Sequence, residues 1–380
     1  MTNKRIDERQ VERVGFRNNL KNTGVYDTKG VTEFHGLKWK FRTDGPIVSS
    51  PTVSGGVAYI GSDDTYLYAI NLENGEEKWK FKTRGPIKST AAVYDDTVFI
   101  SSSDGHLYAI DVDNGELKWN YKAECEDKKA DPWDLWQASP ITYKDQVFFG
   151  GWDGHIYALN IESGDLVKKF SVGRTHSTPA IVDGKLYVAI KGNSKAPYSI
   201  LEGSLSAYDL QSGEQVWTFD EDLSVVSSVV YDDGLLYIGN RTKDCLMAVD
   251  AKTGELEWKY TSPKGSWNQS TPALKDGILY VGSSDELTVS AFDAKTGESQ
   301  WQAEVVNSVH SSPAYADGII YFAIGNNYGK TDQGLIQALD AKSGKELWNY
   351  PIDGHSNSSP VIDEGVLYVG SDDGYLYAIY

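Results

Sequence analysis

The chain has 380 residues, of which 40% are apolar and 24% are charged, and its formal net charge at pH 7 is −18. This apolar content is enough to build a folded core, and the sequence has no apolar run long enough for a membrane-spanning helix. The excess of acid argues against nucleic acid as a partner, because a duplex attracts a basic surface. With only two cysteines, the chain has neither a disulfide framework nor a zinc cluster.

Residues 1–36 come before any repeat and are predicted to form an arm and lead-in. The stretch from Met1 to Arg17 is polar and charged and has no apolar core of the signal-peptide type. We expect a cell-envelope or extracellular location if a leader has been trimmed, and a cytoplasmic location otherwise. Residues 1–22 carry six basic and three acidic side chains, so we expect the arm to lie on its own acidic body. The alternative is that it tethers the chain to another molecule.

From residue 37 onward one phrase recurs, in which Tyr-Ala is followed by Asp or Asn, then Gly-Glu, then Trp. Its first full copy runs from Tyr68 to Trp79. Lys168 takes the Trp position in one degenerate copy. The equivalent positions are 39, 79, 119, 168, 217, 258, 301 and 348, a mean spacing of about 44 residues.

Each period divides into four short runs, which in the first copy are residues 49–53, 57–61, 66–70 and 78–81. The last three alternate or are apolar throughout, which is typical of strands, and turn-forming Gly, Asp and Asn separate them. Four strands in about 44 residues indicate one blade of a β-propeller.

The two ends of the chain complete the count. The last period, residues 358–380, lacks its Trp strand, and Leu37–Phe41 is a Trp strand without the other three. We predict that this N-terminal strand completes the last blade and closes the ring, which removes exposed sheet edges. The predicted fold is therefore all-β, with one eight-bladed propeller of four-stranded antiparallel blades over residues 37–380.

The segment Ala248–Trp258 resembles the pyrroloquinoline-quinone-type propeller repeat, and Arg17–Tyr26 resembles the lead-in of bacterial BamB-like members. The BamB-like resemblance implies a scaffold for β-barrel assembly. The quinone dehydrogenases of this family carry adjacent cysteines and a calcium-bound acidic cluster, whereas this chain has no Cys-Cys pair. We therefore expect no pyrroloquinoline quinone and no metal. Asp63-Asp64 and Asp372-Asp373-Gly374 are interpreted as turns rather than calcium loops.

Insertions indicate which face of the propeller carries function. The turns between first and second and between third and fourth strands are short. The insertions fall in the second-to-third turns and the blade connections, at residues 123–137, 191–203, 261–269 and 326–334. Because binding residues concentrate on elaborated loops, we expect the functional site on this elaborated face.

The residue three before the Pro that begins each first strand is expected to point into the mouth of the central channel, and the two blades without this Pro are placed by alignment. These residues are Val48, Lys88, Gln137, His176, Val226, Gln269, His310 and Asn357. A ligand site and a merely water-lined channel both agree with this polar set. His176 and His310 could exchange protons near neutral pH.

Side chains in or near the elaborated loops add further candidates. Trp136, Trp152 and Trp267 could stack on sugar rings or on a partner's apolar groups, or could simply pack the loops. Arg174 and Arg241 could hold a carboxylate, or could be ordinary surface charges.

We expect a non-catalytic propeller, monomeric, that binds a protein or glycan partner through the elaborated face and channel mouth. The alternative is a carbohydrate-active enzyme, a polysaccharide lyase or hydrolase. In that case His176, His310 or Tyr198 would abstract a proton beside a uronate. The tryptophans would stack sugar rings, and Arg174, Arg241 or Lys88 would neutralise the carboxylate.

Overall fold

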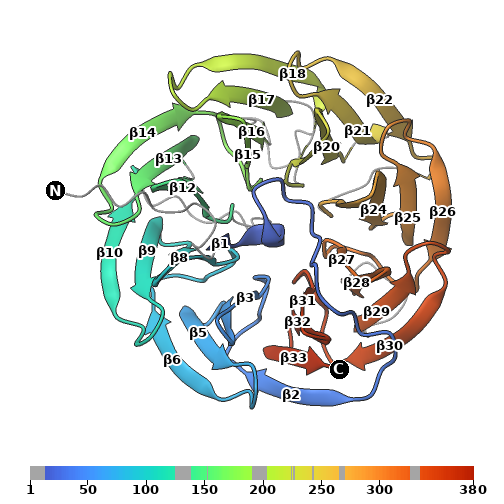
Figure 1. Ribbon diagram of the computed structural model, residues 1–380, viewed down its shortest axis with the longest axis horizontal. Helices are drawn as coiled ribbons and strands as arrows, with labels where there is room; N and C mark the ends of the chain where they lie inside the picture. Colours follow the sequence, from blue (N-terminus) through green and yellow to red (C-terminus); the bar gives the residue numbers. More distant parts are fainter. Residues whose placement is uncertain are drawn as a thin grey trace, which may run out of the picture.

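The computed structural model describes residues 13–124, 138–151, 153–190, 203–223, 225, 227–241, 244–264, 270–325 and 334–380. Eight antiparallel sheets stand around a central axis, one for each blade (Figure 1). The predicted all-β, eight-bladed propeller is confirmed. Within the described residues, the one helical element is the 3-10 helix η1 (Phe16–Asn18), and no helix is long and apolar enough to cross a bilayer.

Blades 1 to 4 follow one another along the chain. Blade 1 holds β3 (Thr52–Ser54), β4 (Val57–Gly61), β5 (Tyr66–Asn71) and β6 (Glu77–Lys82). Blade 2 holds β7 (Ala92–Tyr94), β8 (Thr97–Ser101), β9 (His106–Asp111) and β10 (Leu117–Lys122). Blade 3 holds β11 (Ile141–Tyr143), β12 (Gln146–Gly150), β13 (His155–Asn160) and β14 (Leu166–Ser171). Blade 4 holds β15 (Ala180–Val182), β16 (Lys185–Ile190), β17 (Gly203–Asp209) and β18 (Gln215–Leu223).

Blades 5 to 8 complete the ring. Blade 5 holds β19 (Val230–Asp232), β20 (Leu235–Gly239), β21 (Asp244–Asp250) and β22 (Leu256–Thr261). Blade 6 holds β23 (Ala273–Lys275), β24 (Ile278–Ser283), β25 (Thr288–Asp293) and β26 (Ser299–Glu304). Blade 7 holds β27 (Ala314–Ala316), β28 (Ile319–Ile324), β29 (Gly334–Asp340) and β30 (Glu346–Ile352). Blade 8 holds β31 (Val361–Asp363), β32 (Val366–Gly370), β33 (Tyr375–Ile379) and β2 (Leu37–Arg42).

Burial within a blade follows its position in the ring. Second strands such as β4 and β32 are buried on both faces, because each blade is packed between two others. Outer strands such as β2 alternate between partly buried and exposed residues, since only one face meets a neighbouring blade. The continuous and alternating apolar patterns of the sequence therefore mark middle and outer strands respectively.

The recurring Trp and Gly form the contact between neighbouring blades. Trp217 of blade 4 donates its Nε1–H to the Ala251 carbonyl of blade 5, at 3.1 Å. Gly254, at φ +77°, lies on the same ring, and a Cβ there would come within 2.7 Å of it. Where Lys168 replaces Trp, its Nζ donates to the Leu210 carbonyl of the next blade at 3.3 Å, so the polar half of the contact is kept.

The predicted closure of the ring is also confirmed. β2 pairs antiparallel with β33, with Trp39 opposite Ala378 and Phe41 opposite Leu376. The two strands come from opposite ends of the chain, so no covalent turn joins the third and fourth strands of blade 8. His35 N–H donates to the Tyr380 carbonyl at 2.8 Å beside this junction.

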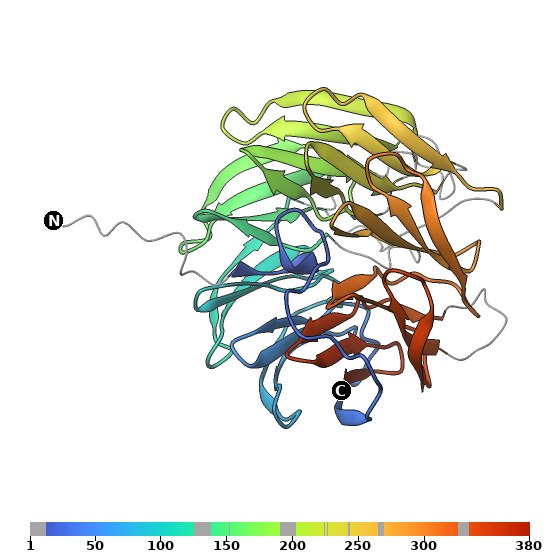
Figure 2. The same cartoon turned by 45° about the vertical axis from the view of Figure 1, so that its right-hand side comes forward.

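The arm lies against the body of the propeller in its described part, residues 13–36. β1 (Arg13–Val14) pairs with β7 and makes blade 2 five-stranded. The chain then crosses the middle of the ring, as the blue segment of Figure 1 and Figure 2 shows. Its carbonyls accept the N–H of the middle residue of four inner strands in turn, which are Ile181, Tyr231, Leu274 and Tyr315.

Candidate functional site

The Ser-Ser-Pro phrase that begins many inner strands has two separate roles. In blade 7 the first serine, Ser311, bonds within its own blade, donating to the Ala323 carbonyl and accepting its N–H, both at 2.8 Å. The second serine, Ser312, lines the central channel. The first hydroxyl therefore holds the blade together, and the second faces a shared space.

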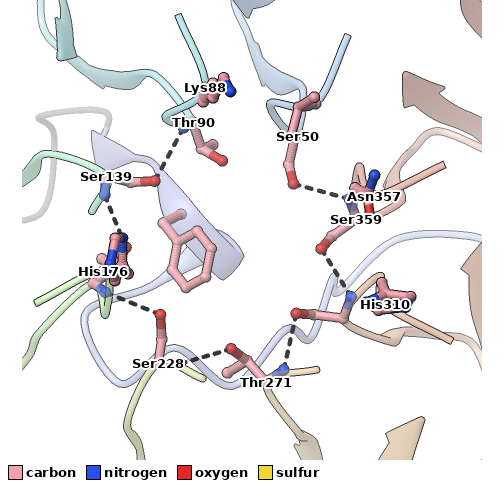
Figure 3. A pocket seen from close by; sticks show the side chains of 14 residues that line it. Ser50, Lys88, Thr90, Ser139, His176, Ser228, Thr271, His310, Asn357 and Ser359 are labelled. Carbon is pink, nitrogen blue, oxygen red and sulfur yellow. Dashed lines mark hydrogen bonds between the residues drawn. The ribbon is translucent and has the colours of Figure 1, made fainter. Parts of the chain in front are cut away.

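The second hydroxyls form a collar around the axis (Figure 3). The backbone N–H of one blade donates to the hydroxyl of the next, as from Thr271 to Ser312 and from Ser312 to Ser359, each at 3.0 Å. Seven such bonds join the eight collar residues Ser50, Thr90, Ser139, Thr178, Ser228, Thr271, Ser312 and Ser359. An oxygen that accepts a backbone N–H keeps its own proton, so the collar can donate to whatever occupies the channel.

The arm occupies one end of the channel, where Phe16 contributes to its wall. Arg17 is 5% exposed and donates to the carbonyls of Pro313 at 2.5 Å and Pro272 at 2.7 Å. Burial lowers the pKa of Arg17 to about 10, which still leaves its guanidinium charged at pH 7. Asn22 Nδ2 donates to the Val229 carbonyl at 2.8 Å. The arm is thus anchored on the inner strands, at the end of the channel where the first-to-second turns of the blades lie.

The opposite end of the channel opens toward the elaborated face. Five of the eight predicted mouth positions lie among the described residues, and all five line this pit, namely Val48, Lys88, His176, His310 and Asn357. His176 and His310 stand on opposite sides of it (Figure 3). Gln137, Val226 and Gln269 lie outside the described residues.

His310 is held in its neutral form. Its pKa is lowered to about 4, chiefly by burial; the charge of Asp285 opposes this shift, and Arg241 and His355 contribute to it. At neutral pH this ring therefore offers the pit one donor and one acceptor rather than a positive charge.

Two carboxylates beside the mouth, which the sequence analysis interpreted only as parts of turns, are further residues of the site. Lys88 Nζ lies 3.9 Å from Asp63 Oδ2, and Asn357 Nδ2 donates to Asp372 Oδ2 at 3.3 Å. The Oδ1 atoms of both aspartates are buried without a hydrogen-bond partner. Burial, and then the charge of Asp63, raise the pKa of Asp372 to about 6.

A signal for this pair was present in the sequence, because both aspartates follow Ser in second-to-third turns. The sequence alone could not show that the two aspartates lie close together, because this requires blades 8 and 1 to be neighbours in the closed ring. In the described part of the chain, no group of three His, Cys, Asp or Glu side chains could hold a metal ion.

The two arginine candidates are not among the described residues that line the pit. Arg174 is half-buried and takes part in an interaction of its own. Arg241 is exposed beyond the end of β20, close enough to influence His310. The aromatic candidates fall outside the described residues, and these are Trp136, Trp152, Trp267 and Tyr198.

The eight blades, the inter-blade Trp contact and the collared channel define an eight-bladed β-propeller whose repeat carries a recurring Trp between neighbouring blades. The sequence matches the family described as outer membrane protein assembly factor BamB over residues 33–196, 201–326 and 288–380. The chain belongs to this family, which confirms the resemblance seen in its repeats. Family and fold together support a binding or scaffold role. A search of curated proteins found no match.

Solved structures show how widely this fold is shared. BamB from Moraxella catarrhalis is 17% identical, with a TM-score of 0.62 over 94% of this chain and 96% of that one. Quinohemoprotein alcohol dehydrogenase from Comamonas testosteroni is 13% identical, with a TM-score of 0.79 over 96% of this chain and 80% of that one. The computationally designed protein Ika8 is 15% identical, with a TM-score of 0.71 over 89% and 97%. At these identities the likeness concerns the fold alone.

Proposed function

We propose that this protein is a non-catalytic scaffold that binds a protein or glycan partner at the elaborated face, with the pit mouth as part of the contact. The observation that carries the proposal is the asymmetry of the channel. The chain's own arm takes one end, and the other end presents Lys88, His176, His310 and Asn357. A rigid ring with one end occupied leaves one axial face for a partner.

The proposal includes no quinone cofactor. The two cysteines, Cys125 and Cys245, are far apart in sequence, unlike the adjacent pair of the quinone dehydrogenases. Phe16 is the one aromatic carbocycle among the described residues that line the pit, and no carboxylate lies among them. A planar quinone with a bound calcium ion would need aromatic walls and acidic ligands, so these described residues do not fit that group.

The enzyme alternative receives less support from the described residues. It needs an imidazole, a guanidinium and an indole within one sugar's width. His176 lines the pit whereas Arg174 does not. Neutral His310 could accept a proton, although a pKa of about 4 makes it a weak base near pH 7.

A thermal-shift screen of the full chain tests the proposal. Its panel contains quinone with calcium, neutral sugars, uronate oligosaccharides and short extended peptides. A ligand at about 100 times its dissociation constant stabilises the folded state by about 2.7 kcal/mol, a shift of several degrees at most for a domain of this size. We expect shifts from peptides or glycans that diminish in Lys88→Gln and His176→Gln and persist in the exposed control His35→Gln.

Three outcomes would contradict this proposal. A thermal shift caused by quinone with calcium would show that the protein binds a quinone cofactor after all. Turnover of a uronate oligosaccharide, lost in His176→Gln, would establish the enzyme reading. A shift that is equal in the wild type and in both mouth variants would place the binding site away from the pit.

A further inference from the structure

The outer strands of three neighbouring blades carry mostly basic side chains on their exposed face. β2, β6 and β10 follow one another around the circumference in blades 8, 1 and 2 (Figure 1). In each strand the aromatic residues point inward, and the alternate residues are exposed. Eight of the nine outward positions are basic, namely Lys38, Lys40, Arg42, Lys78, Lys80, Lys82, Lys118 and Lys122, and the ninth is Asn120. We call these eight residues the basic rim.

The equivalent positions on the opposite half of the ring are mostly uncharged. Blades 4 to 7 place twelve residues there, of which Lys259 alone is basic. The others are Val216, Thr218, Asp220, Glu257, Thr261, Gln300, Gln302, Glu304, Leu347, Asn349 and Pro351. Because all blades share one repeat, the difference does not arise from the fold. It is a property of this chain's outward residues.

Most of the rim charge is uncompensated. Of the eight rim residues, Lys80 and Lys118 have a carboxylate within ion-pair distance among the described residues. The Lys80 partner is Glu77 at 3.4 Å, and the Lys118 partner is Asp96 at 2.7 Å. The whole chain has a net charge of −18, so the part outside these eight cations carries −26. A positive arc on such a body produces a strong local field and steers acidic groups to one place.

Aromatic rings help to hold several of the cations in place. Lys40 Nζ lies 4.4 Å from the centre of the Tyr375 ring, and the Arg42 guanidinium lies 5.7 Å from it. In blade 1, the Nζ atoms of Lys80 and Lys82 each lie 5.5 Å from the centre of the Tyr66 ring. Cation–π contacts reduce the freedom of long side chains without neutralising them. The rim is therefore partly ordered before anything binds.

We infer that the basic rim is a second binding surface, and that it docks an acidic segment of a partner protein. Along one strand the cations recur about every 7 Å, close to the spacing of alternate side chains in an extended acidic peptide. The strong negative charge elsewhere on the protein limits what can bind there. A long polyanion or an anionic membrane that extended beyond the three blades would meet the acidic remainder, whereas a compact acidic segment would not.

A binding titration with a short labelled oligo-L-glutamate peptide tests the inference on the full chain. The rim variant combines Lys40→Gln, Lys82→Gln and Lys122→Gln. Its matched control removes three exposed lysines from turns of blades 5 to 7 by Lys252→Gln, Lys295→Gln and Lys342→Gln. Both variants change the net charge equally and leave the packed core untouched.

We expect fluorescence anisotropy to show binding that falls steeply as the Debye length shrinks from about 10 Å at 0.1 M salt to about 3 Å at 1 M. The rim variant should bind about tenfold more weakly, and the control should stay within about twofold of the wild type. Absence of binding at low salt, or equal weakening in both variants, would overturn the inference. So would binding of anionic phospholipid vesicles or duplex DNA in preference to the oligo-L-glutamate peptide. Lys88 and His176 are intact in both variants, so the thermal shift caused by ligands of the pit should be unchanged. Failure of the basic rim can therefore be distinguished from failure of the proposed pit site.

Discussion

Trp348 in blade 7 donates its indole N–H to the Val31 carbonyl of the arm, at 2.7 Å. In every other blade with the repeat Trp, the acceptor lies next to the third-to-fourth turn of the following blade, as Ala251 does for Trp217. Blade 8 has no covalent turn of this kind, because its last two strands are the two ends of the chain. Residues of the arm therefore replace the missing turn, so the arm belongs to the ring closure.

Replacing Trp348 by Phe should lower the free energy of unfolding by about 1 kcal/mol, the usual net value of one hydrogen bond. The aromatic packing against Tyr321 would largely remain. Urea denaturation measures the loss, and Trp217→Phe is the matched control because it removes the same bond at a covalent turn. If Trp348→Phe has no effect while Trp217→Phe does, the arm does not act as the turn.

The turn glycines that touch the repeat Trp should be much less replaceable than other glycines at positive φ. Gly115, at φ +74°, would place a Cβ 2.7 Å from the Trp79 ring, whereas Gly105, at φ +84°, has nothing within 4 Å. Gly105→Ala should cost about 1–2 kcal/mol for its backbone alone. Gly115→Ala should cost at least about 1 kcal/mol more, because a packed ring must move. Equal losses in thermal or urea unfolding would contradict this account.

The collar should tolerate loss of a hydroxyl unevenly. Ser312→Ala leaves the buried N–H of Thr271 without its acceptor and should cost about 1–3 kcal/mol. Thr90→Val is the control, because no described backbone amide donates to the Thr90 hydroxyl while its own N–H bond to Ser139 remains. Denaturant unfolding compares the two variants through their midpoints, provided that the dependence of the unfolding free energy on denaturant is the same in both. A cost for Thr90→Val as large as that for Ser312→Ala would contradict the role given to the collar bonds.

His310 should make the protein less stable as the pH falls. Its pKa is about 4 in the folded state against 6.5 in the unfolded chain, so between these values the unfolded chain binds more protons. The stabilisation is fully present above pH 6.5, is lost on acidification to about pH 4, and amounts to at most about 3 kcal/mol. His310→Gln should flatten the curve of unfolding free energy against pH in this window. An unchanged curve would contradict the assigned shift.

Asp372 should act in the opposite direction. Its pKa is raised from 3.8 to about 6, so the folded state holds the proton more tightly, and stability falls as the pH rises between these values. Asp372→Asn should therefore stabilise the protein at pH 7 by up to about 3 kcal/mol and have little effect near pH 4. Asp373→Asn tests the specificity of this effect, since Asp373 instead accepts the Tyr377 hydroxyl and should destabilise when replaced.

Much of the fold could be predicted because each blade is specified locally. The turn before Trp258 illustrates this, because Asp250 Oδ1 accepts the N–H of Thr253 at 2.7 Å and Gly254 has the positive φ the turn requires. Such contacts span a few residues and recur in each period, so counting periods counts blades. The placement of the five described mouth residues was predictable for the same reason, since each is set by its offset from the start of an inner strand.

The tertiary structure alone decided which distant residues meet. Asp63 and Asp372 lie near opposite ends of the chain and become neighbours only because β2 closes the ring onto β33. Arg17 looked like part of a charged arm, yet it is buried between the carbonyls of Pro272 and Pro313. The repeat determines a blade through contacts a few residues apart. Contacts between blades, and between the arm and the blades, depend on the closed ring, which no local pattern encodes.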